Sequence, residues 1–195
     1  MKPNKNRTYR KTKYVLYKET LVDFKEHFWA FVGSFLGLGT ISFIHYQYLS
    51  SFDLTLLIGS FGATCVLIYG AIASPLAQPR NLFVGHIVSA IIGVTCYKIL
   101  GEVIYIAAPL AVSLSIIGMQ ILKSLHPPGG ATALIAVTGG ASITDLGYMY
   151  VLNPVLSGVI ILFIIALITN NIPQKRRYPS KKFFFNKKQY NRKRF

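Results

Sequence analysis

The chain has 195 residues, of which 52% are hydrophobic and 14% are charged, and its 21 lysines and arginines give a formal net charge of +15. Only six charged residues lie between Glu26 and Lys175, so the segments between them are long and uncharged. A soluble fold of this size has too little interior to hide that much apolar surface, which excludes a soluble globular class and indicates a membrane protein with several spans.

The uncharged segments predict membrane helices, because about 20 apolar residues cross a hydrocarbon core. The five segments that reach this length are Phe28–Tyr46, Leu54–Ala73, Leu82–Leu100, Val103–Leu122 and Tyr150–Thr169, and only Leu82–Leu100 contains a charge, Lys98 near its end. A shorter sixth element, 126–143, follows Leu125. We therefore expect an all-α membrane protein with five long helices plus this short element. The transmembrane domain is predicted at 27–171, between basic tails at 1–26 and 172–195.

Most of the positive charge lies in the two tails. Eight lysines and arginines fall within residues 1–25 and ten within 175–194. The positive-inside rule places both tails in the cytoplasm, here of a cell inner (cytoplasmic) membrane, and this requires an even number of crossings. The partners expected for the tails are membrane lipids, anionic ones above all, at about 1 kcal/mol per basic residue near the surface. We favour lipids over nucleic acid as the tail partner.

The internal charges agree with an even number of crossings except for Lys98, which lies near the outer end of the third span and would have to extend outward to the surface. Six crossings, with the short element counted, put Arg80 and Lys123 in cytoplasmic turns. The same count puts Asp53, Glu102 and Asp145 in outer turns, although acidic residues have little orienting effect.

A short internal repeat accompanies this topology. Gly-Ala-Thr occurs at 62–64 and again at 130–132, 68 positions later, and the same offset places Ser89 on Ser157. Each proposed half contains three elements, so the second half would run upside down relative to the first. Inverted repeats are a recurrent transporter architecture, with substrate sites near the midplane where discontinuous helices begin. The repeat predicts two inverted halves with half-helices that start at the Gly-Ala-Thr motifs.

The residues at these predicted helix starts favour an anion site. Pro127 and Pro128 disfavour continuation of a preceding helix, and Gly129 allows close backbone approach. The first amides of a short helix lack intrahelical partners and must be satisfied within the membrane. We expect a small anion there, aided by the helix dipole and the hydroxyls of Thr64 and Thr132. The alternative is that the small residues serve close helix packing.

Several motifs resemble a known family. They are Phe-Val-Gly-Ser-Phe-Leu-Gly at 31–37, Gly-Ser-Phe-Gly-Ala-Thr at 59–64, Ser-Pro-Leu-Ala-Gln-Pro-Arg-Asn at 74–81, Gly-His at 85–86 and the segment 126–134, which begins His-Pro-Pro. Together they resemble the HPP integral membrane proteins, named for that tripeptide. The resemblance implies a small helix bundle, usually described as four spans. Members in plants and cyanobacteria are associated with nitrite transport, so it also implies a small monovalent anion as substrate.

The candidate site residues follow from the two motifs and from the turn between them. The predicted substrate-binding residues are Ser60, Phe61, Gly62, Ala63, Thr64, His126, Pro127, Pro128, Gly129, Gly130, Ala131 and Thr132. The predicted gating or recognition residues are Gln78, Arg80, Asn81 and His86. A guanidinium recognises planar anions through paired donors, and the two amides would add neutral ones.

The two histidines of this set have different predicted roles. For His86 a structural hydrogen bond inside the third span is the favoured interpretation, because membrane histidines commonly make polar interhelical contacts. For His126 we favour function, as a donor to the anion or as a proton-coupling group.

We interpret the chain as a transporter or channel for a small monovalent anion, most simply nitrite, and not as an enzyme. No cofactor is expected, and Cys65 and Cys96 have no metal-binding spacing, so no metal site is expected either. We also expect that two copies of the chain can form a homodimer, because 195 residues are few to enclose a transport pathway alone. The alternatives are a membrane enzyme using His126 and His86 as acid and base, and a non-transporting scaffold or sensor that acts through its basic tails.

Overall fold

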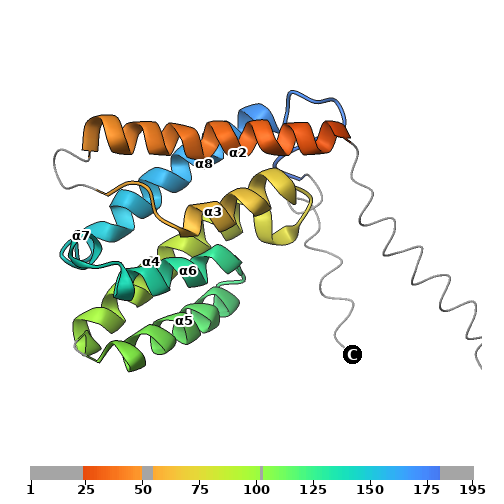
Figure 1. Ribbon diagram of the computed structural model, residues 1–195. Coiled ribbons are helices and arrows are strands. Elements are labelled where there is room, and N and C mark those ends of the chain that lie inside the picture. Colours follow the sequence, from red (N-terminus) through yellow and green to blue (C-terminus); the bar gives the residue numbers. More distant parts are fainter. Residues whose placement is uncertain (1–23, 50–54, 102, 181–195) are drawn as a thin grey trace, which may run out of the picture.

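The computed structural model describes residues 24–49, 55–101 and 103–180, and the helices are labelled as in Figure 1. The basic tails up to residue 23 and from residue 181, and the predicted outer-turn residues Asp53 and Glu102, lie outside these ranges. The domain boundaries proposed near residues 26 and 172 stay predictions.

Four helical segments in the described part of the chain are long and apolar enough to cross a membrane. They are α2 (Phe24–Ile44) with the π-helical turn η1 (His45–Leu49), α4 (Pro79–Leu100), α5 (Ile104–Ile121), and α8 (Ser157–Thr169) with the preceding turn η5 (Val151–Leu156). The predicted all-α membrane architecture is confirmed.

The prediction of five long helices is wrong, because the segment Leu54–Ala73 is not one span. Residues 55–58 have no regular structure, and the helix that follows is short: α3 (Ser60–Cys65) continues into η3 (Val66–Gly70). Glycines at 59 and 70 flank this helix, and a 3-10 turn η4 (Pro75–Ala77) follows. Hydropathy alone does not distinguish a long helix from a short one with apolar coil before it.

The element predicted at 126–143 consists of α6 (Pro127–Thr138) and the single turn α7 (Ala141–Thr144). At about 1.5 Å per residue α6 is roughly 18 Å long, too short to cross the ~30 Å core by itself. The chain nevertheless passes from one end of the bundle to the other here. Leu122, before α6, contacts Arg80 at the start of α4, whereas Tyr148, after α7, contacts Thr95 near its end.

The long helices form two groups with α3 between them (Figure 1). Helices α4, α5 and α6 pack on one another, and α2 packs on α8. Gly33 and Gly37 of α2 face the ring of Tyr69, and a Cβ atom at Gly33 would lie only 2.5 Å from Tyr69 Cδ1. The Tyr69 hydroxyl donates to the Leu162 carbonyl at 2.9 Å. Glycine is therefore needed on α2 so that one buried tyrosine can connect three helices.

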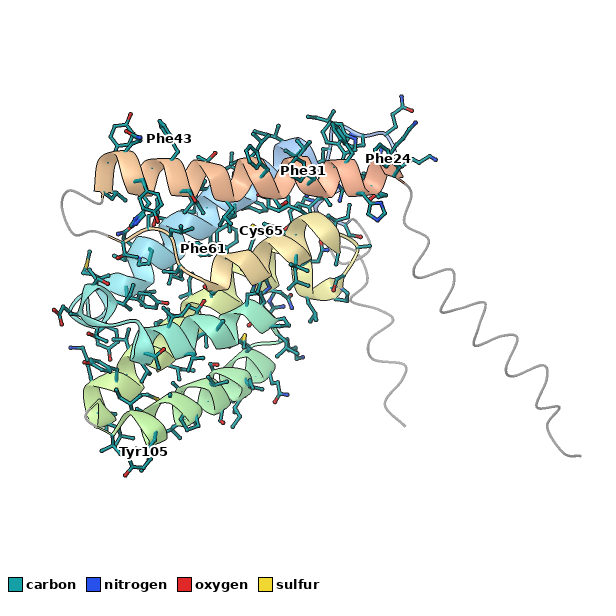
Figure 2. The ribbon with its side chains drawn as sticks, viewed as in Figure 1. Phe24, Phe31, Phe43, Phe61, Cys65 and Tyr105 are labelled. Carbon is teal, nitrogen blue, oxygen red and sulfur yellow. The ribbon has the colours of Figure 1, made fainter. Side chains whose placement is uncertain are left out.

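Large apolar side chains cover the outer faces of the bundle. Phe31 and Phe43 on α2 and Tyr105 on α5 are exposed, and they project away from the helix contacts (Figure 2). Phe61, by contrast, is fully buried between the helices. This distribution is the one expected of a protein whose solvent on these faces is lipid.

Both ends of the described chain lie at the same end of the bundle. Arg176 Nε lies 3.3 Å from Glu26 Oε2, which joins the segment after α8 to the start of α2. Ser180 N donates to Gln78 Oε1 at 2.9 Å, next to the start of α4. Lys98, at the opposite end of α4, lies over the Tyr148 ring at 5.6 Å. An even number of passes through the bundle follows.

Residues 170–180, here called the C-terminal strap, fold back over the end of the helix formed by α3 and η3. Asn170 Nδ2 donates to the Ile68 carbonyl at 2.8 Å, and the Tyr178 hydroxyl donates to the Ala77 carbonyl at 2.7 Å. Arg176 is 3% exposed and donates to the Tyr69 carbonyl. Burial lowers the pKa of Arg176, and Glu26 opposes that shift. The strap thus satisfies carbonyls that a helix end leaves without intrahelical donors.

Candidate functional site

The two short helices lie side by side in the middle of the bundle and run in opposite directions (Figure 1). The helix that starts at Ser60 runs toward the end of the bundle where the strap lies, and α6 runs away from it. The second turns of both helices carry Thr64 and Thr132, and both hydroxyls contact His86 on α4.

His86 connects the two short helices through both of its ring nitrogens. Nε2 lies 2.8 Å from Thr64 Oγ1, and Nδ1 lies 2.7 Å from Thr132 Oγ1. All three side chains are fully buried. The structural hydrogen bond favoured for His86 is therefore present, and it is made twice.

The two threonines make equivalent contacts, 68 positions apart. Thr64 Oγ1 lies 2.9 Å from the Ser60 carbonyl, and Thr132 Oγ1 lies 3.2 Å from the Pro128 carbonyl. Each hydroxyl has one proton but two acceptors within reach when the facing nitrogen of His86 is unprotonated. A neutral His86 therefore donates a hydrogen bond to one threonine hydroxyl and accepts one from the other. The threonine that donates to His86 no longer donates to the carbonyl of its own helix.

His126 is the N-cap residue of α6, and its ring lies beside that of His86, with 4.9 Å between the centroids. Its Nδ1 lies 2.8 Å from the Leu76 carbonyl oxygen, which only accepts, so Nδ1 bears the proton. The neutral ring then has a lone pair at Nε2. That atom is buried and has no hydrogen-bond partner among the residues that the structure describes.

Two serine hydroxyls near the short helices are also buried without a partner. They are Ser60 Oγ, at the start of α3, and Ser89 Oγ, on α4 one turn after His86. A Cβ atom at Gly129 would lie 2.8 Å from Ser89 Oγ, so α6 begins close to this hydroxyl because residue 129 is glycine. Buried polar atoms usually have partners, and exceptions in membrane proteins point to function.

The expectation that the helix starts present unpartnered amides fails at Gly129, Phe61 and Gly62. Pro127 and Pro128 carry no N–H, and Gly129 N donates to the His126 carbonyl at 2.8 Å. At the other helix Phe61 N donates to the Ile58 carbonyl at 3.1 Å, and Gly62 N donates to that of Gly59 at 3.2 Å. Side chains, and not these amides, are the donors that remain.

The structure separates the predicted substrate-binding residues into two sets. Those buried in the bundle are Ser60, Phe61, Thr64, His126, Pro128, Gly129 and Thr132. Those on its surface or only partly buried are Gly62, Ala63, Pro127, Gly130 and Ala131. Nothing lies within 4 Å of a Cβ atom placed on Gly62, so packing within the described residues leaves room for a side chain at this position.

The predicted gating residues hold the turns next to His126. Arg80 Nη2 donates to the Leu122 carbonyl at 2.9 Å, and Asn81 Nδ2 donates to the Leu125 carbonyl at 2.6 Å. Gln78 Nε2 donates to the carbonyls of Ile72 and Ser74 at 3.0 and 2.9 Å. Arg80 is also exposed at this end of the bundle.

Ser89 and Tyr150 were not among the predicted site residues. The Tyr150 hydroxyl donates to the Thr132 carbonyl at 3.0 Å, and both side chains are fully buried. Ser89 follows His86 by three positions, which places the two on one helix face, and this spacing was visible in the sequence. The described residues hold no group of three or more His, Cys, Asp or Glu side chains arranged for a metal ion.

Comparison with known proteins gives a family match over most of the chain. The family model for the HPP transmembrane region matches residues 19–179. Two transmembrane proteins of Dictyostelium discoideum are 46% and 44% identical to the chain over 160 residues, or 80% of its length. The match covers 51% and 56% of those relatives, so the chain spans about half the length of the curated relatives it matches. No solved structure matches with statistical significance.

Proposed function

Because the chain belongs to the HPP transmembrane family, we propose that it carries a small monovalent anion across a membrane, with nitrite as the first candidate. Transport, and not catalysis, is the proposal because no carboxylate in the described residues is buried beside the histidines to orient one of them as a base, and the two hydroxyls on His86 are themselves fully buried. If His86 served only to pack the helices, the buried polar atoms without partners near the short helices would have no explanation.

The observation that supports an anion pathway is three buried polar atoms without partners in the described residues, one at the start of α3 and two near the start of α6. Ser60 Oγ, Ser89 Oγ and His126 Nε2 are all buried. Two of these atoms are hydroxyls that would donate to an oxyanion, and the third donates once it is protonated. The positive dipole ends of the helix Ser60–Gly70 and of α6 would add to the attraction. Nitrite is small, monovalent and able to accept several hydrogen bonds, which suits such a set.

We infer an inverted repeat from the same residues. Thr64 and Thr132, 68 positions apart, contact opposite nitrogens of His86 and have carbonyls at 60 and 128, also 68 positions apart, as acceptors. The short helices that carry them run in opposite directions (Figure 1). This is the relation expected of two halves that meet at a central site.

The orientation in the membrane is also a proposal. Arg80, Lys123 and the strap lie at one end of the bundle, and the basic tails continue from there. We propose that this end faces the cytoplasm of the inner membrane, with anionic lipids around the tails. Arg80 would then attract anions to the cytoplasmic mouth of the pathway. In a homodimer, a second copy of the chain would form part of the wall of the transport pathway.

Anion uptake into liposomes that contain the purified full chain tests this function. Nitrite, nitrate, formate and chloride are offered separately, and empty liposomes give the background. Nitrite uptake that saturates, and that falls when one of the other small anions is added together with nitrite, would support the proposal. Folded protein that moves none of these anions above background would overturn it and would favour a scaffold or an enzyme.

A further inference from the structure

An anion at the proposed site would have no fixed countercharge beside it. Of the charged side chains in the described residues, only Arg176 is buried, and it is engaged at the strap by Glu26 and the Tyr69 carbonyl. The side chains around the two histidine rings are neutral hydroxyls and apolar groups, chiefly Phe61, Thr64 and Thr132. A lone charge in a low-dielectric interior is strongly unfavourable, and a neighbouring opposite charge offsets part of that cost.

His126 is placed to provide that charge. Its Nδ1–H is held by the Leu76 carbonyl at 2.8 Å, so the ring has a fixed orientation and its lone pair is at Nε2. Protonation at Nε2 leaves the Leu76 bond intact and produces an imidazolium with a new N–H donor at an atom that has no partner. No rearrangement of the N-cap is required.

The groups that face His126 do not provide an alternative acceptor of comparable basicity. Helix α4 contributes His86, whose two nitrogens are both engaged by threonines, and α6 contributes Thr132. On the neighbouring elements the Tyr150 hydroxyl donates to the Thr132 carbonyl, and the Tyr178 hydroxyl of the strap donates to the Ala77 carbonyl, next to Leu76; both phenols are neutral in water near pH 7. Arg80, at the first turn of α4, is directed to the Leu122 carbonyl.

We propose that His126 takes up one proton at Nε2 with each anion that binds, so that a proton and a monovalent anion cross together without net charge movement. This inference rests on the proposed anion transport and names its coupling ion. The proton comes from water on the side of higher anion or proton concentration and is released with the anion on the other side. His86 acts as a positioning residue, because it holds the two short helices around the site.

Electroneutral coupling has a direct signature in liposomes. The full chain is reconstituted with an internal pH dye, nitrite is added outside, and a potassium gradient with valinomycin sets the membrane potential. The expected result is acidification inside that accompanies nitrite uptake, with about one proton per nitrite and a rate that does not change with the potential. Nitrous acid crosses lipid unaided, so empty liposomes measure the background.

Two variants and a binding measurement complete the test. His126→Gln is expected to lose coupled uptake or to make the remaining uptake sensitive to potential, while His27→Gln, an exposed histidine on α2, is expected to match the wild type. Calorimetry of nitrite binding in buffers of different ionisation enthalpy counts protons without transport, and one proton per nitrite is expected for the wild type. None is expected for His126→Gln in protein that shows wild-type thermal unfolding.

The possible failures are distinguishable. Potential-driven nitrite uptake without proton movement would overturn proton coupling and leave anion transport standing. Nitrite binding without proton uptake would do the same. Absence of both binding and uptake would overturn the proposed function and, with it, this inference.

Discussion

The Nδ1 atom of His86 lies 2.7 Å from the hydroxyl oxygen of Thr132, and this contact joins a spanning helix to a short one at the centre of the bundle. The other ring nitrogen makes the corresponding contact with Thr64 at 2.8 Å. Neither short helix is long enough to be anchored by a full membrane crossing. A single histidine therefore joins α3 and α6 to α4.

Removal of the Thr132 hydroxyl should destabilise the protein. In Thr132→Val a buried nitrogen of His86 loses its partner, which costs about 1–3 kcal/mol. Thermal or denaturant unfolding in detergent micelles measures the loss. The matched control is Thr138→Val on the same helix, because that threonine is exposed and bonds only its own helix at Leu134. Equal stability of the two variants would contradict the role given to His86.

Gly37 should tolerate a methyl group far less well than Gly39, although both are on α2. A Cβ atom at Gly37 would overlap the hydroxyl end of Tyr69, whereas nothing lies within 4 Å of one at Gly39. Overpacking of this kind costs about 1–3 kcal/mol. Comparison of unfolding midpoints for Gly37→Ala and Gly39→Ala checks this, and a Gly37→Ala midpoint at or above that of Gly39→Ala would show that α2 does not pack here as described.

Arg176 should hold the C-terminal strap in place. In Arg176→Gln the ion pair with Glu26 is lost, so residues 170–180 should open more often. Hydrogen exchange of the strap amides measures this opening, and we expect faster exchange there but not in α8. Arg177→Gln is the control because Arg177 is exposed. Unchanged exchange in Arg176→Gln would mean that the strap is held by its other hydrogen bonds.

The two ends of the bundle should label from opposite sides of the membrane. In a chain with Cys65→Ala and Cys96→Ala, a cysteine replaces either Lys123 or Asp145, both exposed. A membrane-impermeant maleimide should reach Lys123→Cys from the cytoplasmic side and Asp145→Cys from the other side. Labelling of both from one side would contradict the pass through α6 and α7.

Much of the fold could be predicted because charge is so scarce between Glu26 and Lys175. Charged residues in the four long helices lie only near helix ends, and α5 (Ile104–Ile121) matches its predicted range within one residue at each end. The segment 54–73 was misjudged because apolar coil and apolar helix have the same hydropathy. Only the glycines at 59 and 70 marked the difference, and glycine is also common inside membrane helices.

The site was predictable in part for a different reason. The 68-residue offset identified Thr64 and Thr132 as equivalent, but the sequence did not show that one histidine contacts both. The amide donors expected at the Gly-Ala-Thr motif 130–132 lie inside a helix, because α6 already begins at Pro127, three residues earlier than predicted. Ser89 was missed because a serine inside an apolar helix commonly bonds its own backbone, and only the packing reveals that its hydroxyl has no partner.

The most direct test of the proposed anion site is nitrite uptake by liposomes that contain Ser60→Ala, Ser89→Ala or the control Ser34→Ala. Ser60 and Ser89 have buried hydroxyls without a protein partner, whereas the Ser34 hydroxyl bonds the Ala30 carbonyl of its own helix. A hydrogen bond to a charged group contributes about 1.5–3 kcal/mol, so we expect each site variant to raise the half-saturating nitrite concentration by roughly tenfold or more. We expect Ser34→Ala to match the wild type. If the double variant Ser60→Ala/Ser89→Ala takes up nitrite with wild-type half-saturation, the anion does not bind where the two short helices begin.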